Sequence, residues 1–170
     1  MKNIYGLIYY LLAIYLPSNQ VPYIGKMGNL RSFLFRRCIK KAGTNIKVNQ
    51  GVIFSSDIEV GNNVTFNENV RIRKGTKFGS DIEVAPGVNF ITESHRISKT
   101  SLPINKQGSE FKEIIIEDDV WIGTNAVILA GVKLSKGTVV GANAVVTKSH
   151  PPFSVITGVP ARKARSRIDN

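Results

Sequence analysis

Small apolar residues recur at every sixth position along most of this chain, in two series offset by two residues. The first series begins at Ile46 and the second at Val48, and both continue to residues 88–90. After a gap they resume at Ile114 and Ile116 and continue to residues 144–146. A period of six fits neither an isolated helix nor a simple hairpin sheet, and it predicts an all-β parallel β-helix built from hexapeptides.

Each hexapeptide is expected to form one short strand and one corner, and three of them complete a triangular coil of about eighteen residues. Residues i and i+2 of a strand face the same side, so each strand sends one member of each series into the core. The expected corners, such as Gly61-Asn62-Asn63, are rich in glycine and asparagine, which tolerate positive φ. The alternative, a meander of ordinary strands, does not explain a spacing kept over so many positions.

The repeat is interrupted once. The step from Val88 to Ile114 is not a multiple of six, so residues 91–113 are predicted to be a loop inserted into the coil, and this loop contains His95. Three segments follow from this pattern. Residues 1–42 are predicted to be an N-terminal helical segment, residues 43–160 the β-helix, and residues 161–170 a basic C-terminal tail.

The N-terminal segment begins with an apolar run, Ile4–Leu16, that ends at Pro17. This run is shorter than the roughly 20 residues that span a bilayer, and no signal-cleavage pattern follows it. Two interpretations stay open: a helix packed on a coil end or between subunits, or a helix lying in a membrane interface. In the second, the tyrosines would sit among the lipid headgroups, namely Tyr5, Tyr9, Tyr10 and Tyr15.

Residues 29–41 are predicted to form a second helix, which would cap the N-terminal end of the coil. Its arginines are expected to point outward and Gly43 to end it. The basic stretch Arg31–Lys41 would then favour an anionic membrane face.

Charge is concentrated at the two ends of the chain. The net charge is +11, and residues 1–41 hold seven basic residues and no acidic one. Residues 161–170 hold four basic residues and one acidic one, whereas the predicted coil is nearly balanced. Such asymmetry favours anionic partners, either a phosphorylated ligand or a membrane surface. Nucleic acid is not expected, because no aromatic-basic interleaving accompanies the charge.

Cysteine and histidine are scarce. One cysteine excludes an internal disulfide, and two histidines cannot supply a three-histidine metal site. No metal is therefore expected, and a γ-class carbonic anhydrase, which shares this kind of coil, is disfavoured. His150 precedes two prolines and is expected to be a solvated turn residue.

Short motifs follow one another in a characteristic order: Thr92-Glu93-Ser94-His95, Asp119-Val120-Trp121-Ile122-Gly123, Val145-Val146-Thr147-Lys148, and Gly158-Val159-Pro160-Ala161-Arg162. With this order, residues 43–165 resemble the hexapeptide-repeat acyltransferases. The chain looks most like the galactoside, maltose and surface-polysaccharide O-acetyltransferases. The resemblance implies a left-handed parallel β-helix and a homotrimer that binds acetyl-CoA between neighbouring subunits.

The resemblance also assigns roles to individual residues. His95 is the expected general base, since an imidazole of ordinary pKa can accept a hydroxyl proton near neutral pH. Asn67 and Trp121 are expected on the acceptor side. The expected contacts to acetyl-CoA are Thr124, Ala142, Thr147, Lys148, Arg162 and Arg165. The implied activity is O-acetylation of a sugar in a bacterial capsule, lipopolysaccharide or exopolysaccharide intermediate. The expected location is the cytoplasm, with a peripheral position at the inner face of the plasma membrane as a further expectation.

Two departures from the family pattern concern the acceptor and the base. Eight positions after Asn67 the galactoside branch carries an acidic residue, but this chain has Gly75 in a basic stretch, Arg71–Gly75. This difference predicts another acceptor, such as an anionic or lipid-pyrophosphate-linked glycan. The carboxylate that would orient His95 is left open among Glu93, Glu110 and Glu113.

Other functions on the same coil are also considered. A drug-inactivating or nucleotide-sugar N-acetyltransferase would share the fold and the donor. The asparagine-histidine pair and the tyrosine-proline segment of the drug-inactivating enzymes are replaced here by Ser94-His95 and Leu102-Pro103. A non-enzymatic scaffold would show long rows of one surface residue and no interrupting loop. This sequence has no such rows, and the insertion at 91–113 interrupts its repeat.

Overall fold

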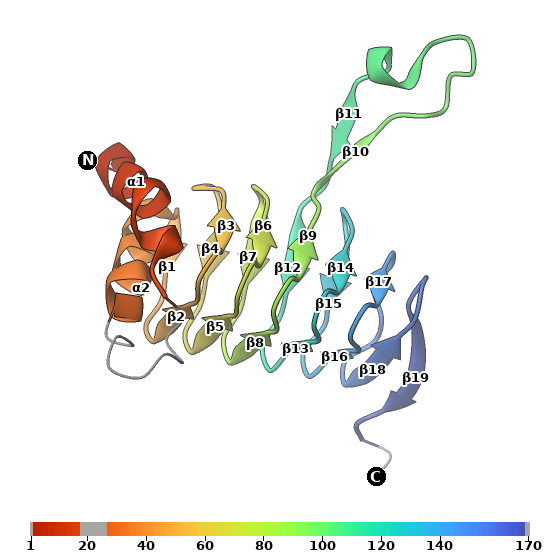
Figure 1. Cartoon of the computed structure of the whole chain (residues 1–170). Coiled ribbons are helices and arrows are strands. Elements are labelled where there is room, and N and C mark those ends of the chain that lie inside the picture. The colour runs from red at the N-terminus through yellow and green to blue at the C-terminus, as the bar shows by residue number, and fades with distance from the viewer. Residues whose placement is uncertain (1, 18–26, 169–170) are drawn as a thin grey trace.

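The computed structural model describes residues 2–17 and 27–168, which form two helices, a stack of short parallel strands and a projecting arm (Figure 1). The helices are α1 (Lys2–Leu11) and α2 (Met27–Cys38), with short 3-10 turns η1 (Ala13–Tyr15) and η2 (Ile104–Lys106). The arm consists of β10 (Glu93–His95) and β11 (Ser109–Phe111), which pair antiparallel.

The other strands form three sheets, one on each side of the coil. Sheet A contains β1 (Lys41–Ala42), β4 (Glu59–Val60), β7 (Thr76–Phe78), β12 (Ile114–Ile116) and β15 (Lys133–Leu134). Sheet B contains β2 (Ile46–Val48), β5 (Val64–Phe66), β8 (Ile82–Val84), β13 (Trp121–Ile122), β16 (Val139–Val140), β18 (Ser154–Thr157) and β19 (Arg162–Ser166). Sheet C contains β3 (Ile53–Phe54), β6 (Arg71–Ile72), β9 (Asn89–Phe90), β14 (Val127–Ile128) and β17 (Val145–Val146).

The pairing register confirms the predicted parallel β-helix. Ile46 pairs with Val64, and Val64 pairs with Ile82, so each coil advances the chain by eighteen residues. The coil resumes in register after the insertion, because Ile114 pairs with Thr76. Residues 91–113 therefore leave the coil as a loop without disturbing the stack.

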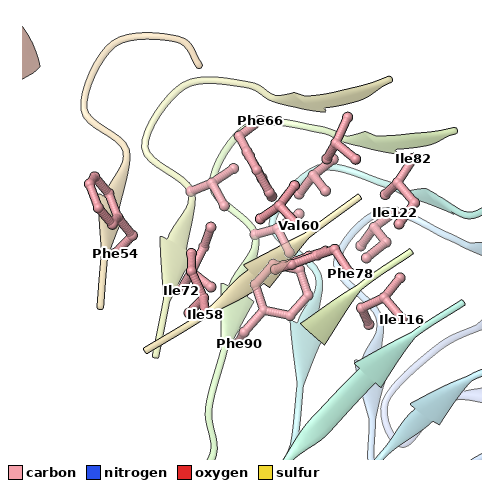
Figure 2. Close-up of a cluster of buried hydrophobic side chains, with 14 of the residues drawn as sticks. Phe54, Ile58, Val60, Phe66, Ile72, Phe78, Ile82, Phe90, Ile116 and Ile122 are labelled. Atoms are coloured by element: carbon pink, nitrogen blue, oxygen red, sulfur yellow. The ribbon is translucent and has the colours of Figure 1, made fainter. Parts of the chain in front are cut away.

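Both six-residue series lie in the core, and all their members are buried. Phenylalanines from the three sheets contact one another edge to face, with 5.0 Å between the ring centroids of Phe66 and Phe78 and 5.1 Å between those of Phe78 and Phe90. Figure 2 shows these rings among the aliphatic side chains of the other strands. Burial of one such side chain stabilises the fold by about 1.5–3 kcal/mol.

Asparagine and aspartate at the corners have a conformational and a bonding role. Asn45, Asn63 and Asp81 adopt φ of 50°, 55° and 59°, as predicted for corner residues. Their side chains form a ladder, in which Asn45 donates to Asn63 over 3.0 Å and Asn63 donates to Asp81 over 2.9 Å. Each coil corner is thereby tied to the next.

The two helices cap the N-terminal end of the coil, as predicted for the second of them. The Phe35 ring of α2 lies 4.5 Å from that of Phe54 and 5.6 Å from that of Phe66. Tyr9 of α1 is fully buried and donates its hydroxyl proton to the Val52 carbonyl over 2.8 Å, while Tyr10 donates to the Phe54 carbonyl over 2.6 Å. The placement of Tyr9 among lipid headgroups is therefore wrong, because the side chain is buried, whereas Tyr10 is 37% exposed although its hydroxyl binds the coil.

The observed second helix, α2, differs from the prediction at its end and in the direction of Arg31. Helix α2 ends at Cys38, Lys41 belongs to β1, and Gly43 lies in a coil corner against the Gly61 carbonyl. Arg31 does not point outward. Its guanidinium is fully buried and donates to backbone oxygens of Val48, Ala13, Leu16 and Pro17, so it binds the α1 segment to the first coil instead of facing solvent.

The basic C-terminal segment is a strand and not a loose tail. In β19, Arg162 pairs with Thr157 and Arg165 pairs with Val155 of β18. Arg167 then binds the Asp119 carboxylate over 3.0 Å and the Gly137 carbonyl over 2.8 Å. These bonds hold the end of the described chain against the last coils.

Candidate active site

The arm that carries His95 is fastened at its root to the preceding coil. Lys74 binds the Glu93 carboxylate over 2.6 Å, and its ammonium lies 5.4 Å from the centroid of the Phe111 ring. Phe111 in turn packs on Gly75, where a Cβ would lie 2.4 Å from the ring. The hydrogen bond from Lys74 lowers the pKa of Glu93. The strand pairing and these contacts fix the direction in which the arm leaves the coil.

His95 is exposed at the end of β10, opposite Ser109 of β11. It borders a groove of about 330 Å³, whose lining residues are Arg73, Ile91, Glu93, Ser94, His95 and Ser109. Within residues 2–17 and 27–168 the exposed imidazole makes no hydrogen bond.

None of the three candidate carboxylates orients His95 within the described chain. Glu93 pairs with Lys74 over 2.6 Å, Glu110 with Lys112 over 3.1 Å, and Glu113 with Lys77 over 2.6 Å. Each carboxylate is therefore committed to a lysine at the root of the arm.

Trp121 and Asn67, the predicted acceptor-side residues, lie on or beside sheet B. Trp121 is 54% exposed, and in the strand register its backbone pairs with Glu83 and Val139. The Asn67 amide accepts from Asn49 over 2.9 Å and donates to Glu83 over 2.7 Å, at the corner where sheet B passes into sheet C. The arm of β10 and β11 leaves the coil on the opposite side from β13 (Figure 1), and Trp121 is not among the residues that line the His95 groove.

Thr124 and Ala142 occupy the same corner of successive coils, where sheet B passes into sheet C. The Thr124 carbonyl accepts from the N–H of Asn143 over 2.8 Å, and both Thr124 and Ala142 are exposed. Among the residues described, the N–H groups of Thr124 and Ala142 donate to no acceptor. Two outward N–H groups in line can bind the carbonyls of an amide-bearing ligand such as the pantetheine arm of acetyl-CoA.

The other four predicted contacts to acetyl-CoA are exposed and gather near the last coils. Thr147 and Lys148 follow β17 at the corner between sheets C and A, and Arg162 and Arg165 lie on β19. Lys148, Arg162 and Arg165 form no ion pair in the part of the chain that the structure describes. These cations are suited to phosphate groups.

His150 is not the solvated turn residue predicted from its prolines. It pairs with Leu134 at the end of sheet A and is half-buried, and its Nε2 atom is buried without a hydrogen-bond partner among the described residues. Burial, and then the charges of Lys148 and Arg162, lower the pKa of His150. Its backbone carbonyl accepts from Ser135 over 3.0 Å, so its role in the described chain is to close the last turn of sheet A.

Arg73 is the site residue that sequence reasoning did not single out. It lines the His95 groove, and the signal for it was present in the basic stretch Arg71–Gly75. The sequence could not say which of these cations reaches the histidine, because that depends on where the arm returns to the coil.

Comparison with known proteins agrees with the fold and the donor. A family model described as "Bacterial transferase hexapeptide (six repeats)" matches residues 113–148. A hexapeptide-repeat acetyltransferase of Vibrio cholerae O1 biovar eltor, solved with acetyl coenzyme A, is 30% identical with a TM-score of 0.78, over 97% of this chain and 86% of that chain. A maltose O-acetyltransferase of Clostridium difficile 630 is 26% identical with a TM-score of 0.80, over 97% of this chain and 85% of that chain.

Curated relatives match over shorter stretches. A chloramphenicol acetyltransferase of Agrobacterium fabrum (strain C58 / ATCC 33970) is 40% identical over 58 residues, which is 34% of this chain and 28% of that protein. The chain thus spans less than a third of the length of this relative. The near-complete match to the Vibrio cholerae enzyme shows the class. The chain belongs to the hexapeptide-repeat acetyltransferases, enzymes that transfer acyl groups.

Proposed function

We propose that this protein transfers an acetyl group from acetyl-CoA to a sugar hydroxyl of a bacterial glycan intermediate, of capsule, lipopolysaccharide or exopolysaccharide. The observation that carries the proposal is the position of His95. It stands on an anchored arm beside a groove, and its ring nitrogens bind no other group in the described chain. A general base must be within reach of the proton that it removes, and this imidazole faces the groove where a hydroxyl can bind.

The residues divide the chemistry between them. Acetyl-CoA supplies the thioester that the sugar hydroxyl attacks. His95, as neutral imidazole, takes the hydroxyl proton as the new C–O bond forms; the C–S bond of the thioester then breaks, and the CoA thiolate leaves and takes up that proton as a thiol. The free N–H groups of Thr124 and Ala142 hold the donor, while Lys148, Arg162 and Arg165 bind its phosphates.

The proposed assembly is a homotrimer with its sites between subunits. His95 stands at one edge of the coil, and Trp121, Thr124 and Ala142 lie on or next to sheet B. A neighbouring copy that turned its sheet B toward the arm would complete the site. Closed ring symmetry repeats this contact at every interface.

Two inactive variants, mixed, test the shared site. His95→Ala and Trp121→Ala are each expected to abolish or strongly reduce transfer of acetyl from acetyl-CoA to glycan acceptors. After co-refolding of equal amounts, random assembly into trimers restores about a quarter of the sites, because each mixed trimer contains one interface with both residues intact. Absence of any recovery in mixed trimers would show that one chain supplies both residues.

An acceptor panel separates O-acetylation from the alternative of N-acetylation. Matched sugars that carry a hydroxyl or an amine at one position are offered with acetyl-CoA, and the products are followed by mass. The proposal requires acetyl esters that mild base removes. Base-stable amides as the main products would favour a drug-inactivating or nucleotide-sugar N-acetyltransferase.

We also propose that the enzyme works at the inner face of the plasma membrane, with α1 and α2 lying on the lipid. The outer side of α1 exposes a row of apolar side chains that includes Leu7 at 59% and Leu11 at 63%. Phe33 of α2 is exposed beside it, with the Arg37 guanidinium 5.2 Å from its ring centroid. An apolar face bordered by cations matches an anionic lipid surface. In the described residues, no helix has the length and apolarity to cross a membrane.

Vesicle binding tests this proposal on the full chain. Leu7→Ser with Leu11→Ser is expected to abolish binding to phosphatidylglycerol vesicles, whereas the control Ile97→Ser, on the distant arm, leaves it intact. Equal binding by both variants would refute the lipid-facing role. Loss of a higher oligomer in sedimentation, without loss of vesicle binding, would assign the face to a second copy.

A further inference from the structure

We infer that the acceptor carries a phosphate group and that Arg71 and Arg73 bind it. This inference rests on the proposed function, because it concerns the acceptor side of the same site. It starts from the basic stretch Arg71–Gly75, whose charges the structure divides between two tasks.

Lys74 belongs to the arm. Its ammonium is paired with Glu93 and lies against the Phe111 ring, so its charge is neutralised and its position is fixed. Arg71 and Arg73 differ from it. Both are exposed, and neither forms an ion pair within residues 2–17 and 27–168. Two cations are therefore left open on this side of the coil.

These two arginines face adjoining grooves on the outer side of sheet C. The first groove, of about 310 Å³, is lined by Ile53, Phe54, Ser55, Arg71, Ile72 and Arg73. The second is the His95 groove described above, and Arg73 lines both. A ligand that places a hydroxyl at His95 can therefore extend over Arg73 toward Arg71.

The charge of this path is positive. Glu93 also lines the His95 groove, but Lys74 compensates its charge, and the arginines are the other charged residues in the lining of the two grooves. A guanidinium offers paired N–H groups that match the oxygens of a phosphate, which a neutral sugar does not require. The expected acceptors are therefore sugars joined to a phosphate or diphosphate.

Direct binding of inorganic pyrophosphate, measured by isothermal titration on the full chain, is the first test. Arg71→Gln and Arg73→Gln are each expected to weaken binding about tenfold, as for loss of a charge-assisted contact. Lys136→Gln is the matched control, since Lys136 is exposed and lies outside both grooves, and it should bind like the parent. Arg73→Lys keeps the positive charge but loses the paired N–H donors of the guanidinium, so its pyrophosphate affinity should lie between those of the parent protein and Arg73→Gln.

Kinetics with matched acceptors is the second test. Sugar 1-phosphates should be acetylated with a KM at least tenfold below that of the free sugars, and Arg73→Gln should raise KM for the sugar 1-phosphates by a much larger factor than KM for the free sugars. Equal KM values in the parent protein would overturn the inference. The inference would also be overturned if pyrophosphate affinity stayed unchanged in the Arg71 and Arg73 variants but fell when Arg162 and Arg165 were replaced.

Failure of the proposed function looks different. If no acceptor is acetylated but pyrophosphate binding still depends on Arg71 and Arg73, the phosphate site stands and the transferase proposal fails. Circular dichroism of each variant, with a spectrum like the parent's, ensures that lost binding reports the groove and not the fold.

Discussion

Arg31→Met should detach the helical cap from the coil. The Arg31 guanidinium donates to the carbonyls of Val48 over 3.0 Å, Ala13 over 3.2 Å, Leu16 over 2.8 Å and Pro17 over 3.1 Å. Methionine fills a similar volume but donates no hydrogen bond, so each of these oxygens loses the donor that Arg31 supplies. A buried acceptor left unsatisfied costs about 1–3 kcal/mol.

Val48 is fully buried, so water cannot replace the lost donor at its carbonyl. The Ala13 carbonyl is also buried but keeps the N–H of Leu16 as a donor over 3.3 Å. The expected net loss in the free energy of unfolding is about 2 kcal/mol, after a small gain because a cation is no longer desolvated. Urea denaturation at fixed protein concentration measures this loss, and hydrogen exchange should show the amides of α1 opening first.

The matched control is Arg36→Met, which removes an exposed arginine from the same helix and should change stability by less than about 0.5 kcal/mol. Arg31→Lys should be intermediate, since an ammonium keeps the charge but cannot reach all four oxygens. A loss below about 1 kcal/mol for Arg31→Met, with α1 still protected, would refute the claim that Arg31 holds the cap.

Three further outcomes follow from local geometry. Gly75→Ala should mobilise the arm and lower kcat about tenfold or more, because the new Cβ would clash with the Phe111 ring and the residue has a φ of +69°. The control Gly108→Ala has a φ of +76° but no neighbour near its new Cβ, so it carries the backbone strain alone and should retain more activity. Phe78→Ala should cost about 3–5 kcal/mol in denaturant unfolding. Burial lowers the pKa of His150 in the folded state, so the unfolded chain binds a proton at higher pH and stability should fall as pH drops below about 6.5. In thermal melts His150→Gln should reduce this dependence of stability on pH, and an unchanged dependence would contradict the burial argument.

The amino-acid sequence determined the coil. A six-residue period can bury its apolar positions only if every strand adds one side of a stacked triangle, so the series begun by Ile46 and Val48 predicted the core, and the break after Phe90 predicted the inserted arm. The corner residues were also predictable, because Asn63 and its equivalents need positive φ wherever the chain turns. These features are local and repeat, so each copy of the pattern strengthens the others.

Tertiary structure decided what each charged or polar side chain does. Arg31 and Arg36 lie on one helix, yet one is buried among carbonyls and the other is exposed, because only the packing of α1 on the coil supplies the oxygens. Lys74 and Arg73 are neighbours in the chain, yet Lys74 holds the arm and Arg73 faces the groove of His95. Pattern alone cannot separate such pairs, since the partner of each cation comes from a segment distant in sequence, and burial and ion pairing depend on where that segment returns.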